Sequence, residues 1–181
     1  RFDAAGEGTP AGVTPAPRVA AEIPGAVAAA VLPLVDASVS AVGVGCAGLV
    51  DHGRGVLVWS PHASGSDVAL RDELAAALAR PVTVDNVANF AALAEARRGA
   101  GAGYRMVLFV GLGAGIGGRV VVPGERERGR GFLGELGHMA LDPGGPPCAC
   151  GGRGCWEALV SGTSLGRAAR EALCCVCCRP G

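Results

Sequence analysis

One histidine and three cysteines near residue 150 constrain the fold of this chain more than any other feature of its sequence. These residues are His138, Cys148, Cys150 and Cys155. Three thiolates and one imidazole are ligands that zinc prefers, and four of them complete the tetrahedral shell of a structural site. Glycines between the cysteines allow the backbone to turn tightly around an ion. The spacing therefore predicts a loop folded around one structural zinc.

Two carboxylates flank this predicted zinc loop. Glu135 lies one helical turn before His138, and Glu157 follows Cys155 by two residues. A loop stiffened by a metal is a good support for carboxylates that bind the hydroxyl groups of a polar ligand. The alternatives are a helix-surface position for Glu135 and, for Glu157, a place in the first turn of a helix, where the helix dipole favours negative charge.

The composition excludes several classes of function. The 181 residues suffice for one domain with a hydrophobic core. All sixteen basic residues are arginine, which excludes a Walker-type lysine, a Schiff-base lysine and a lysine general base. The formal net charge of zero argues against a surface that coats nucleic acid. We expect no membrane-spanning segment and no signal peptide, and the cysteine spacing favours a reducing cytoplasm over disulfides.

The hydrophobic pattern predicts alternating strands and helices. Strands are expected at residues 39–46, 56–59, 81–84, 104–110 and 119–122, and helices at 68–79, 86–98 and 164–173. Residues 18–35 are also prone to form a helix, with Pro24 and Pro33 as breakers. This alternation predicts an α/β fold with a mixed sheet.

The helix expected at 68–79 has the clearest amphipathic pattern. Its apolar face consists of Leu70, Leu74, Ala77 and Leu78. Asp67 precedes the pattern and is expected to be the N-cap.

Composition also suggests a division of the chain into three parts. Residues 1–38 are poorly defined, residues 39–172 carry all the motifs, and residues 173–181 form a cysteine-rich tail. The pattern breaks so abruptly at the tail that we interpret it as a non-native or truncated end. The alternative is that its four thiols bind a second metal.

A glycine-rich segment, 111–118, follows the strand expected at 104–110. Its candidate phosphate-binding residues are Gly113, Ala114, Gly115, Gly117 and Gly118. Closely spaced glycines between two strands allow backbone N–H groups to approach phosphate oxygens. The alternative is a tight structural hairpin without a ligand.

A polar pair, Asp85 and Asn86, lies where a strand is expected to give way to a helix. Ligands bind at the strand ends of α/β sheets, so Asn86 is a candidate contact for a substrate hydroxyl. The alternative is that Asp85 or Asn86 simply caps the helix.

Taken together, these segments resemble the ROK family of repressors, open reading frames and sugar kinases. The resemblance covers residues 40–172 and rests on 42–48, 85–89, 111–118 and above all 134–138 with Cys148, Cys150, Cys155 and Glu157. It implies a partial actin-like, ribonuclease H-like ATPase fold, truncated at both ends. It also implies a homo-oligomer and a hexose or amino-hexose held by Asn86, Glu135, His138 and Glu157, with His138 serving both zinc and sugar.

Several departures from the family pattern argue against a working kinase. Val87 stands where family kinases carry the aspartate that takes the proton from the sugar hydroxyl, and valine cannot accept a proton. Ala114 replaces a frequent threonine, Ala47 replaces a frequent proline, and Arg119 replaces a small residue and would crowd a nucleotide. The family's N-terminal phosphate-binding turn has no counterpart in residues 1–38.

We therefore interpret the chain as the sugar-sensing domain of a transcriptional repressor and assign no catalytic residue. DNA binding would require a helix-turn-helix domain that is not visible in this sequence. One alternative is an ATP-dependent sugar kinase resembling glucokinases, which alone would require ATP as a cofactor. The other alternative is an inactive gene fragment.

Overall fold

The computed structural model describes residues 7–122 and 134–177. The chain forms two compact units, residues 1–87 and 88–181. This boundary is drawn from spatial contacts, so the three-part division drawn from composition stays a prediction.

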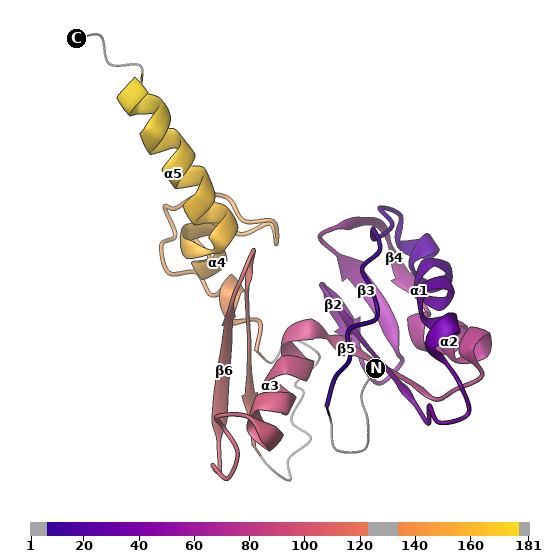
Figure 1. The fold of residues 1–181 in the computed structure, drawn as a ribbon. Helices are drawn as coiled ribbons and strands as arrows, with labels where there is room; N and C mark the ends of the chain where they lie inside the picture. The colour runs from indigo at the N-terminus through magenta and orange to yellow at the C-terminus, as the bar shows by residue number, and fades with distance from the viewer. Residues whose placement is uncertain (1–6, 123–133, 178–181) are drawn as a thin grey trace. The chain divides into compact units, whose positions relative to one another are not determined.

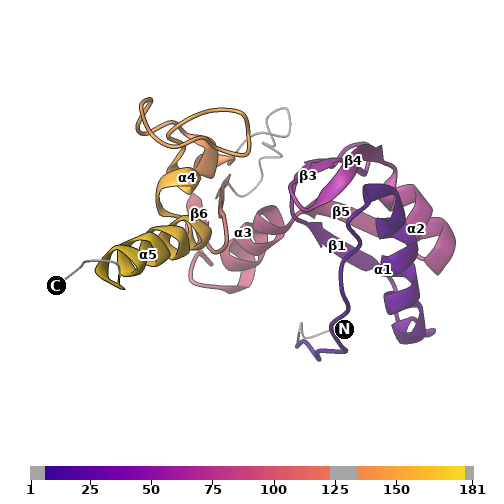
Figure 2. The ribbon, with the colours of Figure 1, turned by 90° about the horizontal axis from the view of Figure 1, so that it is seen from above.

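The first unit contains short helices and two small sheets (Figures 1 and 2). Its helices are η1 (Ala20–Glu22), α1 (Ile23–Val31), η2 (Leu32–Leu34) and α2 (Leu70–Leu78). Its strands are β1 (Val42–Cys46), β2 (Leu49–Asp51), β3 (Val56–Ser60), β4 (Ala63–Val68) and β5 (Val82–Asn86). The strands β2, β3 and β4 form an antiparallel meander.

Strands β1 and β5 run parallel and in register, from Val42 opposite Val82 to Cys46 opposite Asn86. Their carboxyl ends therefore lie side by side, and Asn86 is the last residue of β5. This is the strand end at which the sequence predicted a ligand contact.

The core of the first unit forms between these strands and the helices α1 and α2, which lie beside each other in Figure 2. The fully buried side chains include Leu57, Leu70, Leu74 and Val84. Leu70, Leu74 and Leu78 are buried as the amphipathic pattern of α2 predicted, but Ala77 is exposed. The expectation for Ala77 is wrong because the core-facing stripe of α2 is narrow and Ala75 packs against the core instead.

Two expectations about helix ends in this unit are also corrected. Asp67 does not cap α2, because β4 continues to Val68 in pairing with β3 and the N-cap is Ala69. Pro24 lies in the first turn of α1, where a missing N–H costs nothing, so it begins the helix rather than breaking it. Pro33 does mark the end of the α-helix, which tightens into η2.

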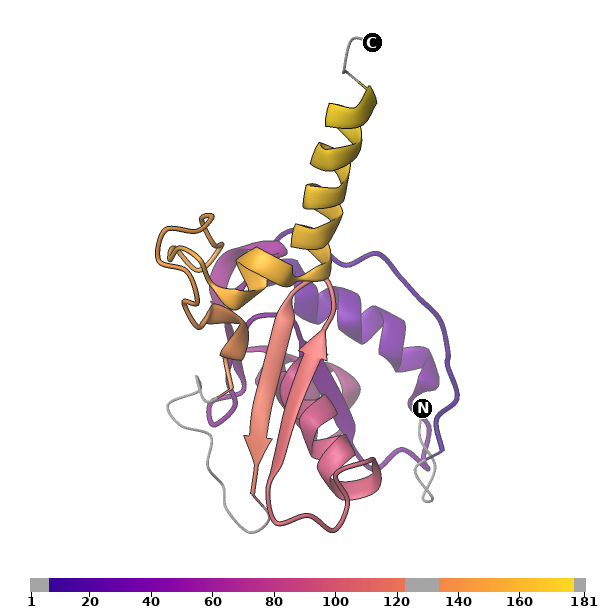
Figure 3. The same cartoon turned by 90° about the vertical axis from the view of Figure 1, so that its left-hand side faces the viewer.

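The second unit is built around a two-stranded hairpin (Figure 3). Its elements are α3 (Val87–Arg98, whose first residue belongs to the first unit), β6 (Val107–Leu112), β7 (Ile116–Val121), η3 (Leu136–His138), α4 (Trp156–Val160) and α5 (Gly162–Cys177). Both strands reach closer to the turn than expected, since Leu112 pairs with Ile116 and leaves a loop of residues 113–115.

Helix α5 begins two residues before the predicted start at 164 and continues to Cys177. The backbone of the first part of the cysteine-rich tail is therefore helical. Residues 178–181 lie outside the described part of the chain, so the interpretation of the tail stays a prediction. No helix among the described residues is long and apolar enough to cross a membrane.

Candidate functional site

The segment between η3 and α4 folds back on itself and brings the predicted metal ligands together. His138 is the last residue of η3, and Cys155 immediately precedes α4. Isolated bridges pair Ala140 with Cys155 and Pro147 with Arg153, which closes the loop from both sides. Gly154 has a φ of 60°, and an added Cβ would collide with the Asp142 carbonyl group. This close approach explains why a glycine is needed directly before Cys155.

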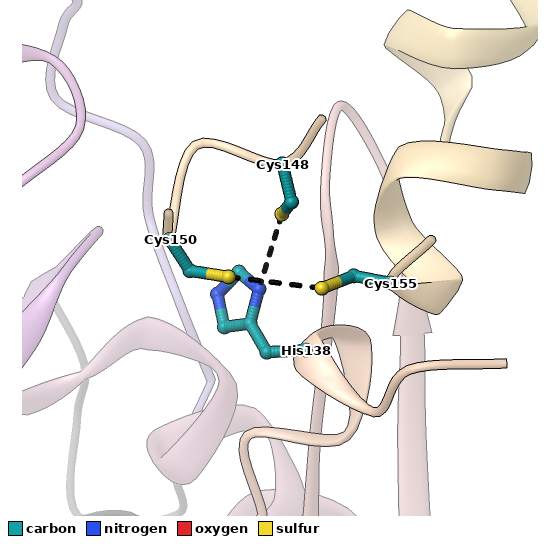
Figure 4. A group of neighbouring side chains, drawn as sticks. All are labelled: His138, Cys148, Cys150 and Cys155. Carbon is teal, nitrogen blue, oxygen red and sulfur yellow. Dashed lines mark hydrogen bonds between the residues drawn. The ribbon is translucent and has the colours of Figure 1, made fainter. Parts of the chain in front are cut away.

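The four candidate ligands form one cluster (Figure 4). The ligand atoms of His138, Cys148, Cys150 and Cys155 all lie within 4.8 Å of one another. The Cys148 sulfur is 3.6 Å from His138 Nδ1, and the Cys150 and Cys155 sulfurs are 3.7 Å apart. Zinc held tetrahedrally at ~2.3 Å from sulfur places two sulfurs about 3.8 Å apart. The cluster therefore has the ligand types and the spacing of a zinc site, with Nδ1 as the nitrogen ligand.

The three thiols sit in different surroundings. Cys155 is buried, and burial raises the pKa of its thiol to about 12. The backbone amide of Gly152 lowers the pKa of the exposed Cys150 thiol. Because only thiolates bind zinc, binding of the ion would release protons from this cluster.

Glu135 lies beside the cluster on the other side of the His138 ring. Its Oε2 atom is 3.9 Å from His138 Nε2, while Nδ1 faces the cysteines. Burial raises the pKa of Glu135, Glu157 raises it further, and His138 acts in the opposite direction. One imidazole thus links the candidate metal site to the candidate sugar-binding carboxylates.

Glu157 lies in the first turn of α4, and its carboxylate reaches the tip of the β6–β7 hairpin. Its Oε2 atom accepts a hydrogen bond of 2.7 Å from the backbone N–H of Ile116. The same oxygen lies so close to Gly115 that a Cβ there would collide with it. Glu157 therefore has a structural partner in addition to the ligand contact predicted for it.

The glycine segment forms a hairpin, which was the alternative to a phosphate loop. At the tip, Gly113 and Ala114 are exposed. Their carbonyl oxygens accept hydrogen bonds from the N–H groups of Gly162 and Thr163 at the start of α5, at 2.9 and 3.3 Å. A phosphate role for the tip residues Gly113, Ala114 and Gly115 stays a prediction.

Two glycines of the hairpin have a packing role that the sequence did not indicate. A Cβ at Gly117 would lie 2.8 Å from the Ala88 Cβ of α3. A Cβ at Gly118 would lie 2.6 Å from Leu136 Cδ1 of η3 and 2.8 Å from the Phe109 carbonyl oxygen. Because both residues lack a side chain, α3 and η3 can approach the hairpin closely, whether or not Gly117 and Gly118 also bind phosphate.

In the first unit, the residues around Asn86 are tied to one another. The Asn86 side-chain Nδ2 donates a hydrogen bond of 2.8 Å to the carbonyl oxygen of Gly48. Asp85 is buried, and its Oδ1 atom accepts a hydrogen bond of 2.8 Å from the Asn86 backbone N–H. Val87, at the start of α3, is exposed.

The sequence reasoning missed His52, which follows β2 and lies against this pair. Its Nδ1 atom is 2.9 Å from the Val84 carbonyl oxygen and 3.5 Å from Asp85 Oδ2. No short-range pattern links residues 52 and 85. Of the predicted sugar contacts, the structure brings together Glu135, His138 and Glu157 in the second unit, whereas Asn86 belongs to the first.

A family model described as "ROK family" matches residues 9–176 of this chain. The chain belongs to the ROK family. The α/β fold expected from the resemblance is therefore confirmed. The chain forms part of the actin-like ATPase fold of ROK sugar kinases.

The chain resembles both kinases and a repressor within the family. It is 38% identical to a glucokinase of Streptomyces coelicolor over 132 residues, which are 72% of this chain and 42% of the glucokinase. It is 35% identical to the xylose repressor of Bacillus subtilis over 125 residues, 68% of this chain and 32% of the repressor.

Among solved structures, a ROK family glucokinase from Streptomyces griseus in complex with glucose and AMPPNP superimposes with a TM-score of 0.77 at 38% identity. The match covers 88% of this chain and 52% of that structure. The chain thus spans about half the length of its relatives or less. Family membership alone does not separate kinase from repressor.

Proposed function

We propose that this chain is the sugar-binding domain of a sugar-responsive transcriptional regulator of the ROK family and does not transfer phosphate. The observation that carries this proposal is Val87. The resemblance places the proton-accepting aspartate of ROK kinases at this position, and the valine side chain has no atom that accepts a proton.

Asp85, the carboxylate nearest to Val87 in the sequence, is not placed to take over this role. Asp85, two residues away, is 4% exposed, and its two oxygens face the Asn86 backbone N–H and the His52 ring. A carboxylate that is buried and whose two oxygens both face protein groups is withdrawn from a substrate.

The ligand that we propose is a hexose or amino-hexose bound by Asn86, Glu135, His138 and Glu157. Support comes from the cluster that gathers Glu135 and His138 beside Glu157. Carboxylates and amides are suitable partners for ring hydroxyls, because a buried hydroxyl left without a partner costs about 1–3 kcal/mol. A structural zinc at the neighbouring cluster would hold His138 and, through it, Glu135 in place.

The remaining partners are proposed from the family alone. DNA would be bound through a domain outside this chain, and the regulator would act as a homo-oligomer. A cytoplasmic location is consistent with DNA binding and with the formation of a homo-oligomer.

An ATP-dependent sugar kinase is the second candidate, and one observation favours it. The tip of the β6–β7 hairpin is exposed and rich in glycine, which suits a loop that receives phosphate groups. The identity to glucokinases points in the same direction.

A coupled assay of ATP consumption over a panel of hexoses separates the two candidates. We expect no turnover, or a trace, because loss of a general base lowers a rate by ~10²–10⁴. Val87→Asp should raise any trace activity, and Val87→Ala is the matched control that should not. Turnover by the unaltered protein at ~1–10³ per second, as in metabolic enzymes, would overturn the regulator proposal.

Titration calorimetry with the same sugars tests the binding site itself. We expect one hexose or amino-hexose to bind at millimolar to micromolar affinity and Glu135→Ala to weaken it by about tenfold or more, since the carboxylate bonds to hydroxyls are charge-assisted. The exposed Glu171 of α5 offers a control, Glu171→Ala, which should bind as the wild type does. Equal affinities of wild type and Glu135→Ala would refute the role of Glu135.

A further inference from the structure

We propose that His52 and Asp85 are positioning residues that hold Asn86 in the orientation needed to bind the sugar. This inference rests on the proposed function, because it concerns how one contact of the proposed sugar site is built. It adds His52, a residue that lies outside the sequence motifs from which the sugar site was predicted.

The inference begins with the burial of Asp85. Its side chain is 6% exposed, and a buried carboxylate must be compensated by hydrogen-bond donors or positive charge. Oδ1 accepts the Asn86 backbone N–H at 2.8 Å, and Oδ2 lies 3.5 Å from His52 Nδ1. The carboxylate therefore connects the His52 ring to the backbone of Asn86.

The tautomer of His52 follows from its other partner. Nδ1 lies 2.9 Å from the Val84 carbonyl oxygen, and a carbonyl oxygen only accepts hydrogen bonds. Nδ1 must therefore carry the proton, so the same N–H that bonds to Val84 also points positive charge density toward Asp85. The ring is anchored to β5 at two consecutive residues, directly before Asn86.

Asn86 is held from a second direction by its own side chain. Nδ2 donates to the Gly48 carbonyl oxygen at 2.8 Å, in the turn between β1 and β2. His52 follows the other end of β2. The short strand β2 thus connects two supports of Asn86, one at Gly48 and one at His52. Such double support reduces the freedom that a binding residue would otherwise lose when ligand arrives.

Calorimetry with the sugar that binds the wild type tests this inference. We expect His52→Ala to weaken affinity about 3- to 10-fold, the loss expected for one hydrogen bond. His52→Asn should restore affinity to within about twofold, because the asparagine Nδ2 occupies the place of the imidazole Nδ1 and can donate to Val84. The exposed His62 provides the matched control, and His62→Ala should bind as the wild type does.

A double-mutant cycle shows whether His52 acts through Asn86. If it does, adding His52→Ala to Asn86→Ala should weaken binding no further, since the residue being positioned is already gone. Additive losses would overturn the inference, and so would equal affinities of wild type and His52→Ala, or failure of His52→Asn to restore binding. If the wild type binds no sugar on the panel, the proposed function fails and the inference fails with it. A wild type that binds while His52→Ala is unaffected refutes the inference alone.

Discussion

An alanine substitution at Gly118 should destabilise the second unit, whereas the same substitution at Gly113 should not. A Cβ at position 118 would lie 2.6 Å from Leu136 Cδ1 and 2.8 Å from the Phe109 carbonyl oxygen. The leucine methyl group can rotate away, but the Phe109 carbonyl belongs to the β6–β7 ladder and cannot. A Cβ at position 113 would lie 3.9 Å from the Gly115 carbonyl oxygen, an ordinary van der Waals contact.

Two opposing effects determine how much Gly118→Ala changes the free energy of unfolding. Overpacking of this kind costs about 1–3 kcal/mol. The alanine also lowers the conformational entropy of the unfolded chain, which raises the free energy of unfolding by ~0.4–1 kcal/mol. We expect a net loss of roughly 1–2 kcal/mol for Gly118→Ala, equivalent to a fall in melting temperature of about 2–8 °C in a chain of this size. For Gly113→Ala only the favourable term remains, so the melting temperature should stay constant or rise slightly.

Thermal unfolding followed by circular dichroism, with all proteins at the same zinc concentration, measures the difference. Equal melting temperatures for the two variants, or a lower one for Gly113→Ala, would refute the reasoning. ATP titration of the Gly113 variant adds a second result. A stable protein with weakened nucleotide binding would favour the phosphate-binding prediction for the hairpin tip.

Three further predictions concern the metal cluster and the first unit. Metal analysis should find one zinc per chain in the wild type and much less bound zinc in Cys150→Ser. A full zinc content in that variant, or an unchanged melting temperature after chelation, would contradict the zinc site. Burial raises the pKa of Cys46, so its thiolate forms above the usual pH range of thiols, and peptide mass spectrometry should detect slow alkylation at neutral pH that accelerates as pH rises. Labelling of Cys46 at the rate of a free cysteine would contradict this. Arg80 donates to the carbonyl oxygens of Val39 and Asp36 at 2.7 and 3.1 Å, so Arg80→Ala should lower stability by about 1–3 kcal/mol, and an unchanged urea midpoint would disprove it.

The parts of the fold that the sequence predicted well carry strong local patterns. The leucines of α2 recur at helical spacing and are all buried. The metal ligands lie close in sequence, so their residue types and spacing were enough to predict the cluster that the structure contains. Helix α3 begins one residue after its expected start at 86, whereas β5 continues two residues beyond its expected end at 84.

The parts that it missed depend on partners distant in the chain. Strand β2 has three residues, too few to show a periodicity, and β4 is mostly exposed and carries serine, glycine and aspartate. Both are strands because β3 pairs with them on either side. The contacts of His52 with Asp85 and of Glu157 with Ile116 likewise join residues more than thirty positions apart. Tertiary packing alone creates such contacts, and no local propensity encodes them.

The hydrogen bonds between the hairpin tip and the start of α5 have a mechanical consequence. The carbonyl oxygens of Gly113 and Ala114 accept hydrogen bonds from Gly162 and Thr163, and the Glu157 carboxylate accepts one from the Ile116 N–H. These hydrogen bonds therefore tie the tip to the starts of α4 and α5. Any displacement of the tip must break these hydrogen bonds or move α4 and α5 with it. A ligand that shifts Glu157 would therefore move both helices together.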